Sequence, residues 1–588
     1  MPIEQLGLNR ELASFDFRKL RSWVLGWAGI ESLETYHNTM GLAVVVGSLI
    51  DRTNLIFLRT DKVEINNRLT YNPPLAAIEL RLRALLSAQL YAAAWVDPSP
   101  ATLMGVFEHL RTLRYILHDY VPRPVSKSPP NPGEVRYQWQ TGTLLFTDLA
   151  GFTSLLEANA AQGRKGAETL LGVINDYFAS MIEIVSKSGG DLLEFTGDAM
   201  LVQFLGGIDQ EEDTARAVRA GLRMQRAMAQ FANIETARGV LSLRMRVGIH
   251  CGRYISADIG TPLRMAHVLL GQSVQQAKQA EGSGTVGRVC LTETAGLCLG
   301  EQFRFEPGKP GYLLVADDFT DDRLGEYDIT LTGRRMPSSV LLDRSVSGLV
   351  SEIEEAVKRL EPLASYIPKT ILRLLVENAD RRKIPPDFPE PTVMFVNLIG
   401  LPKLVDKATP AEEARLVLGC SRVFALIDAV VSAKGGVLQK VTAHLDGSDM
   451  LIYFGVPDVH TNDPSRAASA AIAIRDIIVD LPPVIIGVEE VKVSCQIGLS
   501  LGPVFAAEVG EPRGRREFNI LGDTVNTAAR LMSKAEENQI LIGKRVFESI
   551  GLNFDCEALG AVSLKGKSAL TPVFVLHGSK VERAKGGV

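Results

Sequence analysis

The chain contains the same segment twice, and each copy lacks polar residues that the other copy has. The first copy opens with GTLLFTDLAGFT from Gly142 to Thr153, and the second with PTVMFVNLIG from Pro391 to Gly400. An aspartate of the first copy, Asp148, is therefore replaced by Asn397 in the second. Near the end of the copies the asymmetry reverses, since GDTVNTAAR (522–530) of the second matches GQSVQQAKQ (271–279) of the first. Complementary losses predict one working site shared by two domains and one degenerate site.

Length and composition limit the class of protein. A chain of 588 residues predicts about two to four domains. Hydrophobic and charged contents of 46% and 22% are those of a globular protein, and a net charge of −5 gives no basic field to attract nucleic acid. The six scattered cysteines indicate reduced thiols in a cytoplasmic protein. No secretory leader is evident, and the apolar stretch Gly41–Ile50 is shorter than the roughly 20 residues of a membrane span.

The order of predicted elements indicates an α+β fold. Helical periodicity over Ala167–Val185 and Glu211–Phe231 is followed by strand alternation over Leu243–His250. Helices are therefore expected to cover one face of a sheet in each repeat. We assign residues to four segments: a small, mainly helical module of unknown role (1–130), the first repeat (137–315), a connector with two helices (316–386) and the second repeat (389–578). A stiff, proline-rich linker is expected over 121–133.

Two aspartates of the first repeat have the pattern of a cation site. Asp148 follows a buried strand, and Asp198 lies at a predicted hairpin turn, so neighbouring strands can place the carboxylates side by side. Mg²⁺ prefers such oxygen ligands together with phosphate. The residues after Asp148, including Phe152 and Thr153, can begin a helix whose free N–H groups would face a polyphosphate. The alternative is that Asp148 caps a helix and Asp198 is an ordinary turn residue.

Polar residues of the second repeat have the pattern of a nucleotide site. Asn526 and Arg530 share a helix face, where an arginine can stabilise charge on a phosphate and an amide can orient a sugar. Lys440 and Asn519 together would suit adenine, whose N1 accepts and whose N6 donates a hydrogen bond. Lys565 would reach the terminal phosphates. The alternative for Asn526, Arg530 and Lys565 is an ordinary solvated surface position.

At these residues the chain resembles the class III nucleotidyl cyclases, and within them the soluble, bicarbonate-responsive adenylyl cyclases with two catalytic domains on one chain. The motifs that carry the resemblance are GTLLFTDLAGFT, GDLLEFTGDA, VMFVNL and FNILGDTVNTAAR. The resemblance implies two ferredoxin-like domains that pack head to tail as an intramolecular pseudo-heterodimer. It implies conversion of ATP to 3′,5′-cyclic AMP and pyrophosphate with two Mg²⁺ ions, Mn²⁺ or Ca²⁺ being the alternatives.

The resemblance also assigns roles to the residues. Asp148, Asp198 and the carbonyl of Leu149 would bind the metal ions. The nucleotide would be bound by the remaining set: Lys440 and Asn519 at the base, Asn526 at the ribose, Arg530 at the transition state, Lys565 at the triphosphate. The family usually has Asp or Thr where this chain has Asn519, and an amide oxygen can still accept from N6.

At the expected degenerate site, two residues of this chain differ from those of the soluble cyclases that it resembles. The soluble cyclases bind bicarbonate there through a lysine and an arginine, whereas the matching residues here are Glu194 and Lys278. A carboxylate repels the anion, so we expect Glu194 and Lys278 to pair and bicarbonate to activate weakly or not at all. The alternative is that Glu194 is solvated and that the anion binds elsewhere.

Two rival functions remain at this stage. A guanylyl cyclase would need a base-binding acceptor, and Lys440 is a donor. A catalytically silent pair that senses nucleotides for an unknown regulator of the N-terminal module would not need the intact set Asp148, Asp198, Asn526 and Arg530.

Overall fold

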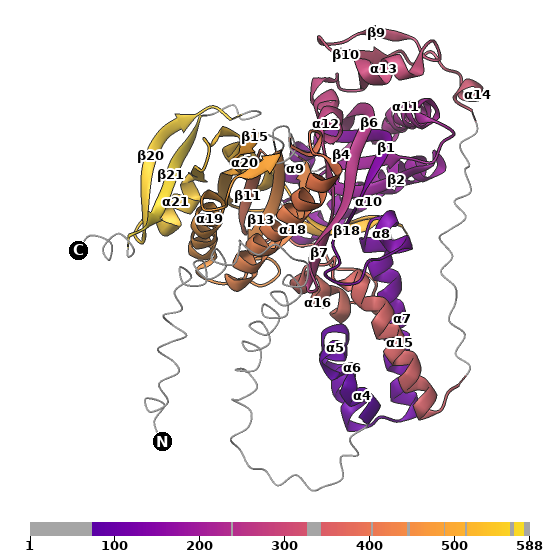
Figure 1. The fold of residues 1–588 in the computed structure, drawn as a ribbon, viewed down its shortest axis with the longest axis vertical. Helices are drawn as coiled ribbons and strands as arrows, with labels where there is room; N and C mark the ends of the chain where they lie inside the picture. Colours follow the sequence, from indigo (N-terminus) through magenta and orange to yellow (C-terminus); the bar gives the residue numbers. More distant parts are fainter. Residues whose placement is uncertain are drawn as a thin grey trace. The chain divides into compact units, whose positions relative to one another are not determined.

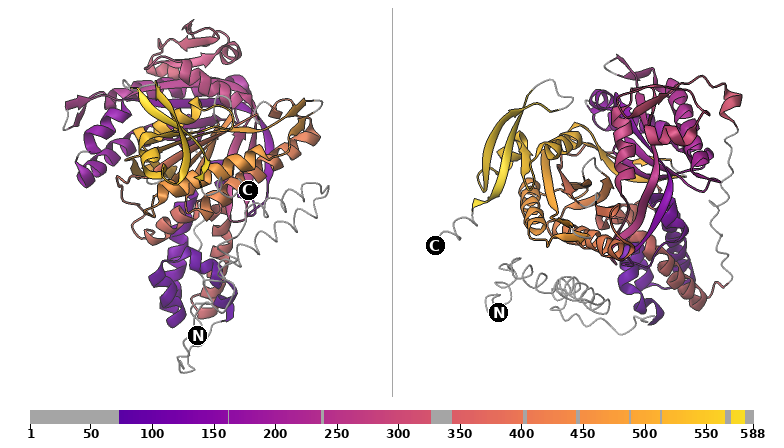
Figure 2. Two further views of the ribbon diagram at one scale, coloured as in Figure 1. Left: turned by 90° about the vertical axis from the view of Figure 1, so that its left-hand side faces the viewer. Right: turned by 45° about the horizontal axis from the view of Figure 1, so that its top comes forward.

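The structure is a computed structural model. It describes residues 73–160, 162–236, 239–325, 343–400, 404–443, 447–486, 489–511, 514–564 and 570–580. Most of the expected N-terminal module (1–72), with its apolar stretch Gly41–Ile50, lies outside the described residues, and so does Lys565. The described residues all belong to one compact unit (Figures 1 and 2).

A helical bundle combines residues before the first repeat with residues of the connector. Helix α7 lies beside α15, and their buried faces share one core (Figure 1). Helix α7 begins with Pro100 behind the cap Ser99, whose Oγ accepts from Thr102 N at 3.5 Å. The helices of the bundle are α4 (Pro73–Ala77), α5 (Glu79–Leu85), α6 (Ala88–Val96), α7 (Pro100–Tyr120), α8 (Arg123–Lys127), α15 (Val346–Ala364) and α16 (Lys369–Glu377).

The segment 121–133, expected to be a stiff linker, contains the short helix α8. Val121 and Val125 of this segment are buried in the core of the bundle. The predicted connector helices are present as α15 and α16, and they pack against α7 and α5. The connector is therefore part of a folded bundle, which the local sequence pattern did not predict.

The first repeat forms a mixed sheet in the order β2-β3-β1-β6-β8-β10-β9, with β7 paired to β6. Its strands are β1 (Arg136–Ala150), β2 (Gly190–Thr196), β3 (Ala199–Phe204), β4 (Ile234–Thr236), β5 (Gly239–Leu241), β6 (Arg244–Thr261), β7 (Arg264–Leu270), β8 (Val289–Thr292), β9 (Phe305–Pro307) and β10 (Tyr312–Val315). Its helices are α9 (Phe152–Ala160), α10 (Gly163–Lys187), α11 (Gln210–Ala227), η2 (Met228–Phe231), α12 (Gln272–Ser283) and α13 (Glu293–Leu299), with α14 (Asp321–Leu324) following.

The second repeat has the same strand order, β12-β13-β11-β16-β19-β21-β20, and its β17–β18 hairpin corresponds to the end of β6 with β7. Its strands are β11 (Thr392–Ile399), β12 (Val437–Ala443), β13 (Gly447–Phe454), β14 (Val484–Ile486), β15 (Glu489–Val491), β16 (Ser494–Leu501), β17 (Phe505–Gly510), β18 (Arg516–Leu521), β19 (Ile540–Gly543), β20 (Phe554–Val562) and β21 (Thr571–Ser579). Its helices are α18 (Pro410–Ala433), α19 (Asp463–Val479), α20 (Asp523–Lys534) and α21 (Lys544–Ile550).

The two repeats pack head to tail through reciprocal contacts. Gly510 N of the second repeat donates to Asn175 Oδ1 on α10 at 3.2 Å, and Gly260 N of the first donates to Ser421 Oγ on α18 at 3.0 Å. Each repeat also inserts apolar residues of its hairpin into the core of the other, Phe505 in one direction and Ile255 in the other. This exchange confirms the predicted pseudo-heterodimer and fixes the two repeats against each other.

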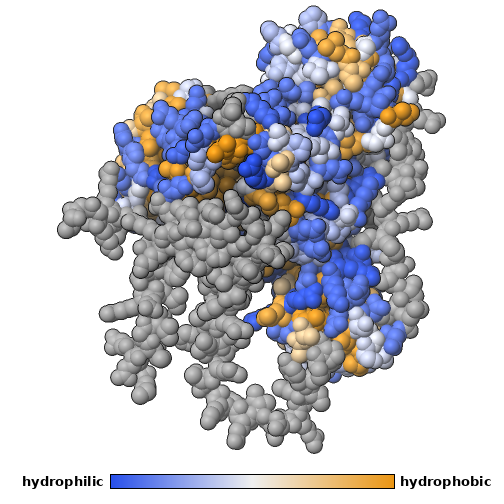
Figure 3. Space-filling model, in the orientation of Figure 1, coloured by the Kyte–Doolittle hydropathy of each residue, from blue (hydrophilic) through white to orange (hydrophobic). Residues whose placement is uncertain are grey.

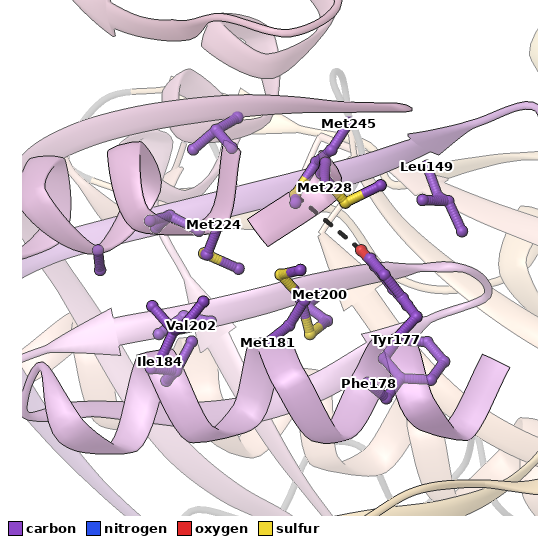
Figure 4. Packing of buried hydrophobic residues seen from close by; sticks show 14 of the residues in the cluster. Leu149, Tyr177, Phe178, Met181, Ile184, Met200, Val202, Met224, Met228 and Met245 are labelled. Atoms are coloured by element: carbon purple, nitrogen blue, oxygen red, sulfur yellow. Dashed lines mark hydrogen bonds between the residues drawn. The ribbon is translucent and has the colours of Figure 1, made fainter. Parts of the chain in front are cut away.

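A methionine-rich core lies beneath the end of β1 (Figure 4). Met181 on α10, Met200 on β3 and Met245 on β6 are fully buried, and the Tyr177 hydroxyl points to Met245 Sδ at 4.0 Å. Leu149, one residue after Asp148, is buried in the same core. The backbone that carries Asp148 is therefore fixed by packing on one side of the sheet.

The surface that Figure 3 shows mixes hydrophilic and hydrophobic residues. Among the described helices, only α18 is long and apolar enough to cross a membrane, and half of its most apolar stretch is buried inside the protein.

Candidate active site

Two carboxylates of the first repeat lie next to each other. Asp148 stands near the end of β1, and Asp198 lies in the turn between β2 and β3, where Gly197 has a φ of +73°. Thr147 is opposite Met200 in the ladder, and Met200 N donates to Thr147 Oγ1 at 3.0 Å. Burial and the charge of Asp148 raise the pKa of Asp198 to about 7. The strand register thus brings the two predicted metal ligands together, and the effect of Asp148 on the pKa of Asp198 reflects their proximity.

Arg246 is a partner of this pair that the sequence analysis did not identify. It lies opposite Asp148 in the β1–β6 ladder, pairs with that carboxylate, and places its Nε 3.1 Å from Glu281 Oε1. The second repeat has Asn397 opposite Gln496 at this register, joined by an amide hydrogen bond of 3.0 Å. The second copy has thus replaced an acid–arginine pair by two amides. Arg246 lies in the predicted strand Leu243–His250. Pairing of this strand with the strand of Asp148 places the two residues opposite each other.

The donor set fits a divalent cation bound together with a phosphate. Within the described ranges no group of three or more His, Cys, Asp or Glu side chains is arranged to hold a metal ion. Two carboxylates with a backbone carbonyl such as that of Leu149 are the partial protein shell that Mg²⁺ takes when substrate phosphates complete its coordination.

The backbone after Asp148 turns sharply into helix α9. Gly151 has a φ of +96°, and a Cβ atom there would lie 2.6 Å from Ser242 O, so only glycine fits. The helix begins at Phe152, which is buried, and Thr153, which is half-buried. The first N–H groups of a helix lack intrahelical partners, so this end of α9 is suited to an anion.

Lys440 of the second repeat contacts the first repeat beside the β2–β3 turn that carries Asp198, called the aspartate turn below. It follows a bulge in β12, as Glu194 follows one in β2, which confirms that the two positions correspond. Lys440 Nζ donates to the carbonyl of Phe195 and lies 3.0 Å from Glu517 Oε2. Glu517 was not among the residues predicted to lie beside Lys440.

Asn519 crosses the interface at the aspartate turn itself. The residue is fully buried on β18, and its Nδ2 donates to the carbonyl of Gly197 at 3.3 Å. Its Oδ1 accepts from Gln439 Nε2 and from the N–H of Ile520, both at 3.1 Å. The amide oxygen expected to accept from N6 of a purine is therefore already hydrogen-bonded in this structure.

Helix α20 brings the other two predicted residues to the same interface. A Cβ atom at Gly522 would lie 3.4 Å from Leu156 Cδ1, so the start of α20 lies against α9. Asn526 and Arg530 follow on this helix and are half-buried. Arg530 Nη1 is buried, lies 3.8 Å from Asp523 Oδ1, and has no hydrogen-bond partner in the described part of the chain. A phosphate oxygen would satisfy that donor.

A cavity lies between the two repeats, next to Lys440. Its empty space is about 1040 Å³ with its open mouth included, and its wall includes Glu194, Val268, Lys440, Thr442, Ser448 and Glu517. Ser448 stands where the first repeat has Asp198, because both follow the glycine of the hairpin. Neither Asp148 nor Asp198 is among the residues of this wall, which Lys440 and Glu517 share with Glu194.

Burial raises the pKa of Glu194 to about 7, against the attraction of Lys440 and, to a smaller extent, of Lys278. The Thr196 hydroxyl donates to Glu194 at 3.2 Å. Lys440 has a stronger electrostatic influence on Glu194 than Lys278, the partner that the sequence analysis expected.

Comparison with known proteins agrees with the duplicated architecture. The model of the adenylate and guanylate cyclase catalytic domain matches residues 135–315 and 385–578. The chain belongs to this family. As a tandem class III cyclase it is similar to adenylate cyclase type 10 of Mus musculus, with 25% identity over 406 residues, or 66% of this chain. It spans only 23% of the mouse protein's length.

Two further proteins align with different shares of the chain. An adenylate cyclase of Mycobacterium tuberculosis is 27% identical over 227 residues, which cover 38% of this chain and 48% of that protein. A solved class III adenylyl cyclase-like ATP-binding protein from Pseudomonas aeruginosa aligns with 75% of this chain and 92% of its own, at 14% identity and a TM-score of 0.48.

Proposed function

We propose that the chain is an adenylyl cyclase that converts ATP to 3′,5′-cyclic AMP and pyrophosphate at one of its two interdomain sites. The observation that carries the proposal is the bond between Asn519 and the Gly197 carbonyl, next to Asp198. It joins strand β18, which carries the predicted base-binding residue Asn519, to the turn that carries a predicted metal ligand. A triphosphate between α9 and α20 would then contact acids from one repeat and cationic and amide groups from the other.

Catalysis of this reaction requires that the protein position the substrate and stabilise the charge that develops on its phosphates. The ATP 3′-oxygen forms a bond to the α-phosphorus and loses its proton to water. The bond from the α-phosphorus to the oxygen that bridges to the β-phosphate breaks, and pyrophosphate leaves. Asn526 orients the ribose for this in-line attack, and Arg530 supplies an unsatisfied buried donor to the α-phosphate as negative charge develops. Lys440 donates to N1 of adenine, and the N–H groups at Phe152 and Thr153 bind the polyphosphate.

Asp148, Asp198 and the Leu149 carbonyl would hold two Mg²⁺ ions, with Mn²⁺ or Ca²⁺ as substitutes. Bound divalent cations supply charge neutralisation for the triphosphate and favour ionisation of the 3′-hydroxyl. Lys565 would contact the terminal phosphates. The cytoplasm, where ATP is abundant and thiols stay reduced, is the proposed location, and all six cysteines are free.

Product formation by the purified chain tests the proposal. MgATP and MgGTP are supplied separately, and cyclic nucleotide is measured for the native chain, Asp198→Ala and the matched control Ser448→Ala. We expect cyclic AMP as the main product, loss of at least about 100-fold in Asp198→Ala, and near-native turnover in Ser448→Ala. Cyclic GMP as the main product would identify a guanylyl cyclase. Nucleotide binding without product would identify a silent sensor.

The degenerate site is proposed to respond little to bicarbonate. Glu194 lines the cavity, and its carboxylate opposes an anion there when it is ionised, above its pKa of about 7. Cyclic AMP formation is measured against bicarbonate concentration at fixed pH and ionic strength, with Glu194→Lys as a second variant. We expect a flat response in the native chain. Several-fold activation of the native chain would contradict this part of the proposal.

A further inference from the structure

The internal duplication extends into the helices that precede the two repeats. The sequence YVP (120–122) stands at the end of α7, and YIP (366–368) stands just after the end of α15. In both places the proline precedes a further helix, α8 or α16. The long helices α7 and α15 lie side by side (Figure 1). Each repeat is therefore preceded by the same unit, a long helix followed by a tyrosine and a proline.

Tyr120 binds a carboxylate on the hairpin of the second repeat. Its buried hydroxyl donates to Glu508 Oε2 at 2.6 Å, and Arg516 Nη1 donates to Glu508 Oε1 at 2.7 Å. Glu508 lies two residues before Gly510, which has a φ of +122° at the end of β17. The carboxylate thus divides its two oxygens between an arginine and the tyrosine of α7, and this bond joins α7 to β17.

The first repeat has a carboxylate at the matching place. Asp258 lies two residues before Gly260, which has a φ of +129°. Arg136 Nε donates to Asp258 Oδ2 at 2.6 Å, and His267 Nδ1 lies 2.9 Å from Asp258 Oδ1. An arginine again holds one oxygen. The histidine holds the other oxygen, the one that in the second repeat accepts from tyrosine.

The strand register explains why only the first repeat has this competitor. His267 lies opposite Asp258 in the β6–β7 ladder, and Phe518 lies opposite Glu508 in the β17–β18 ladder. An imidazole can hydrogen-bond a carboxylate, and a phenyl ring cannot. Ser256 Oγ lies 3.3 Å from His267 Nε2, so the imidazole is held at its second nitrogen as well.

Tyr366, the counterpart of Tyr120, has no such bond. It is 8% exposed, and its buried hydroxyl has no partner at hydrogen-bonding geometry among the described residues. Burial raises the pKa of this phenol, and the neighbouring Asp258 carboxylate raises it further. The hydroxyl therefore lies near the acid without completing a bond to it. A buried donor without an acceptor costs free energy, which favours a rearrangement that brings the two groups together.

We propose that Tyr366 and Asp258 form a latch that is open in this structure, because His267 holds the carboxylate oxygen that the tyrosine would use. The latch closes when the imidazole turns away, and Tyr120 with Glu508 is its closed counterpart. The opposite face of β6 packs into the core of the second repeat. A closed latch would thus tie the connector to a strand of the interface between the repeats. The inference goes beyond the proposed function and holds whatever reaction the chain catalyses.

Thermal unfolding of the full chain tests the inference by a double-mutant cycle. Tm is measured by differential scanning calorimetry for Tyr366→Phe, His267→Phe and the chain with both substitutions. Tyr120→Phe is the matched control for a closed latch. His267→Phe copies the residue at the matching position of the second repeat and removes the competing nitrogen. Backbone hydrogen exchange at residues 364–367 is followed in the same variants as a local readout.

We expect Tyr120→Phe to lower Tm by about 2 °C, because a hydrogen bond to a buried carboxylate is lost. Tyr366→Phe should leave Tm unchanged or slightly higher, since its hydroxyl has no bond to lose. In the His267→Phe background the latch is closed, so Tyr366→Phe should lower Tm by about 2 °C. Exchange at 364–367 should be slower in His267→Phe than in the native chain.

Two results would overturn the inference. A loss of about 2 °C from Tyr366→Phe in the native chain would mean that the latch is already closed. An unchanged Tm from Tyr366→Phe in both backgrounds would mean that His267 is not what keeps it open. If His267→Phe does not fold, His267→Leu takes its place, and the same two results decide.

Discussion

The side-chain amide of Asn519 donates to the backbone carbonyl of Gly197 at 3.3 Å, across the interface between the two repeats. Gly197 precedes Asp198, so this bond connects the strand of the predicted base-binding residue in one repeat to the turn of a predicted metal ligand in the other. We expect Asn519→Asp to place a carboxylate against that carbonyl and near Asp198, and to lower the free energy of unfolding by about 1–3 kcal/mol. The KM for ATP should rise with it.

Thermal unfolding and initial-rate kinetics measure both effects of Asn519→Asp. The control is Asn378→Asp, which changes an amide at the end of α16, in the helical bundle, that donates to the carbonyl of Leu374 at 2.9 Å. An unchanged KM in Asn519→Asp would show that the bond does not organise the site.

Arg530 and Gln279 occupy matching positions on α20 and α12. Arg530→Ala should lower kcat by about 100- to 1000-fold, because the donor for the α-phosphate is lost, with a small effect on KM. Gln279→Ala should leave kcat within a factor of about two. Steady-state rates at saturating ATP provide the comparison. Equal losses in the two variants would mean that both halves of the interface contribute to catalysis.

Arg264 is buried and joins three segments through backbone carbonyls. Its guanidinium donates to Tyr366 at 2.6 Å, Gln439 at 2.8 Å and Met265 at 2.5 Å. Arg264→Met leaves these acceptors without a donor, and we expect a loss of about 2–4 kcal/mol, or on the order of 3 °C in Tm for a unit of this size. Differential scanning calorimetry checks the value.

The control for Arg264 is Arg475→Met, which removes a guanidinium that donates to the carbonyl of His577 at 2.8 Å within the second repeat alone. It should change Tm less. The reverse ranking of the two variants would argue against a role for Arg264 in joining the repeats.

Glu194 gives the stability of the chain a pH dependence that can be measured. Its folded-state pKa of about 7 lies above the unfolded value, so the folded state binds the extra proton at acid pH and this stability is lost as pH rises through 7. Glu194→Gln should therefore raise Tm at pH 8, by about 2 °C, and should have little effect below pH 4.5. A difference in Tm that does not vary between pH 5 and pH 8 would contradict the assignment.

The sequence by itself determined the duplicated α+β fold and its polar asymmetry. The repeated frames around Asp148 and Asn397 imply the same strand order twice, because the alternation of apolar residues fixes which strands are buried. The turn at Asp198 and the helix that carries Asn526 and Arg530 were also predicted from local sequence patterns. Each of these features depends on neighbours within a few dozen residues along the chain.

Only the tertiary structure decided which groups the predicted residues contact. Arg246 lies opposite Asp148 because β1 and β6 pair. Glu517 forms an ion pair with Lys440 because the β17–β18 hairpin contacts β2. The packing of the connector helix α15 on α7 was also absent from the local pattern. Such contacts join residues far apart in sequence, and their partners are chosen by burial, register and charge balance across an interface, which no single stretch of sequence contains.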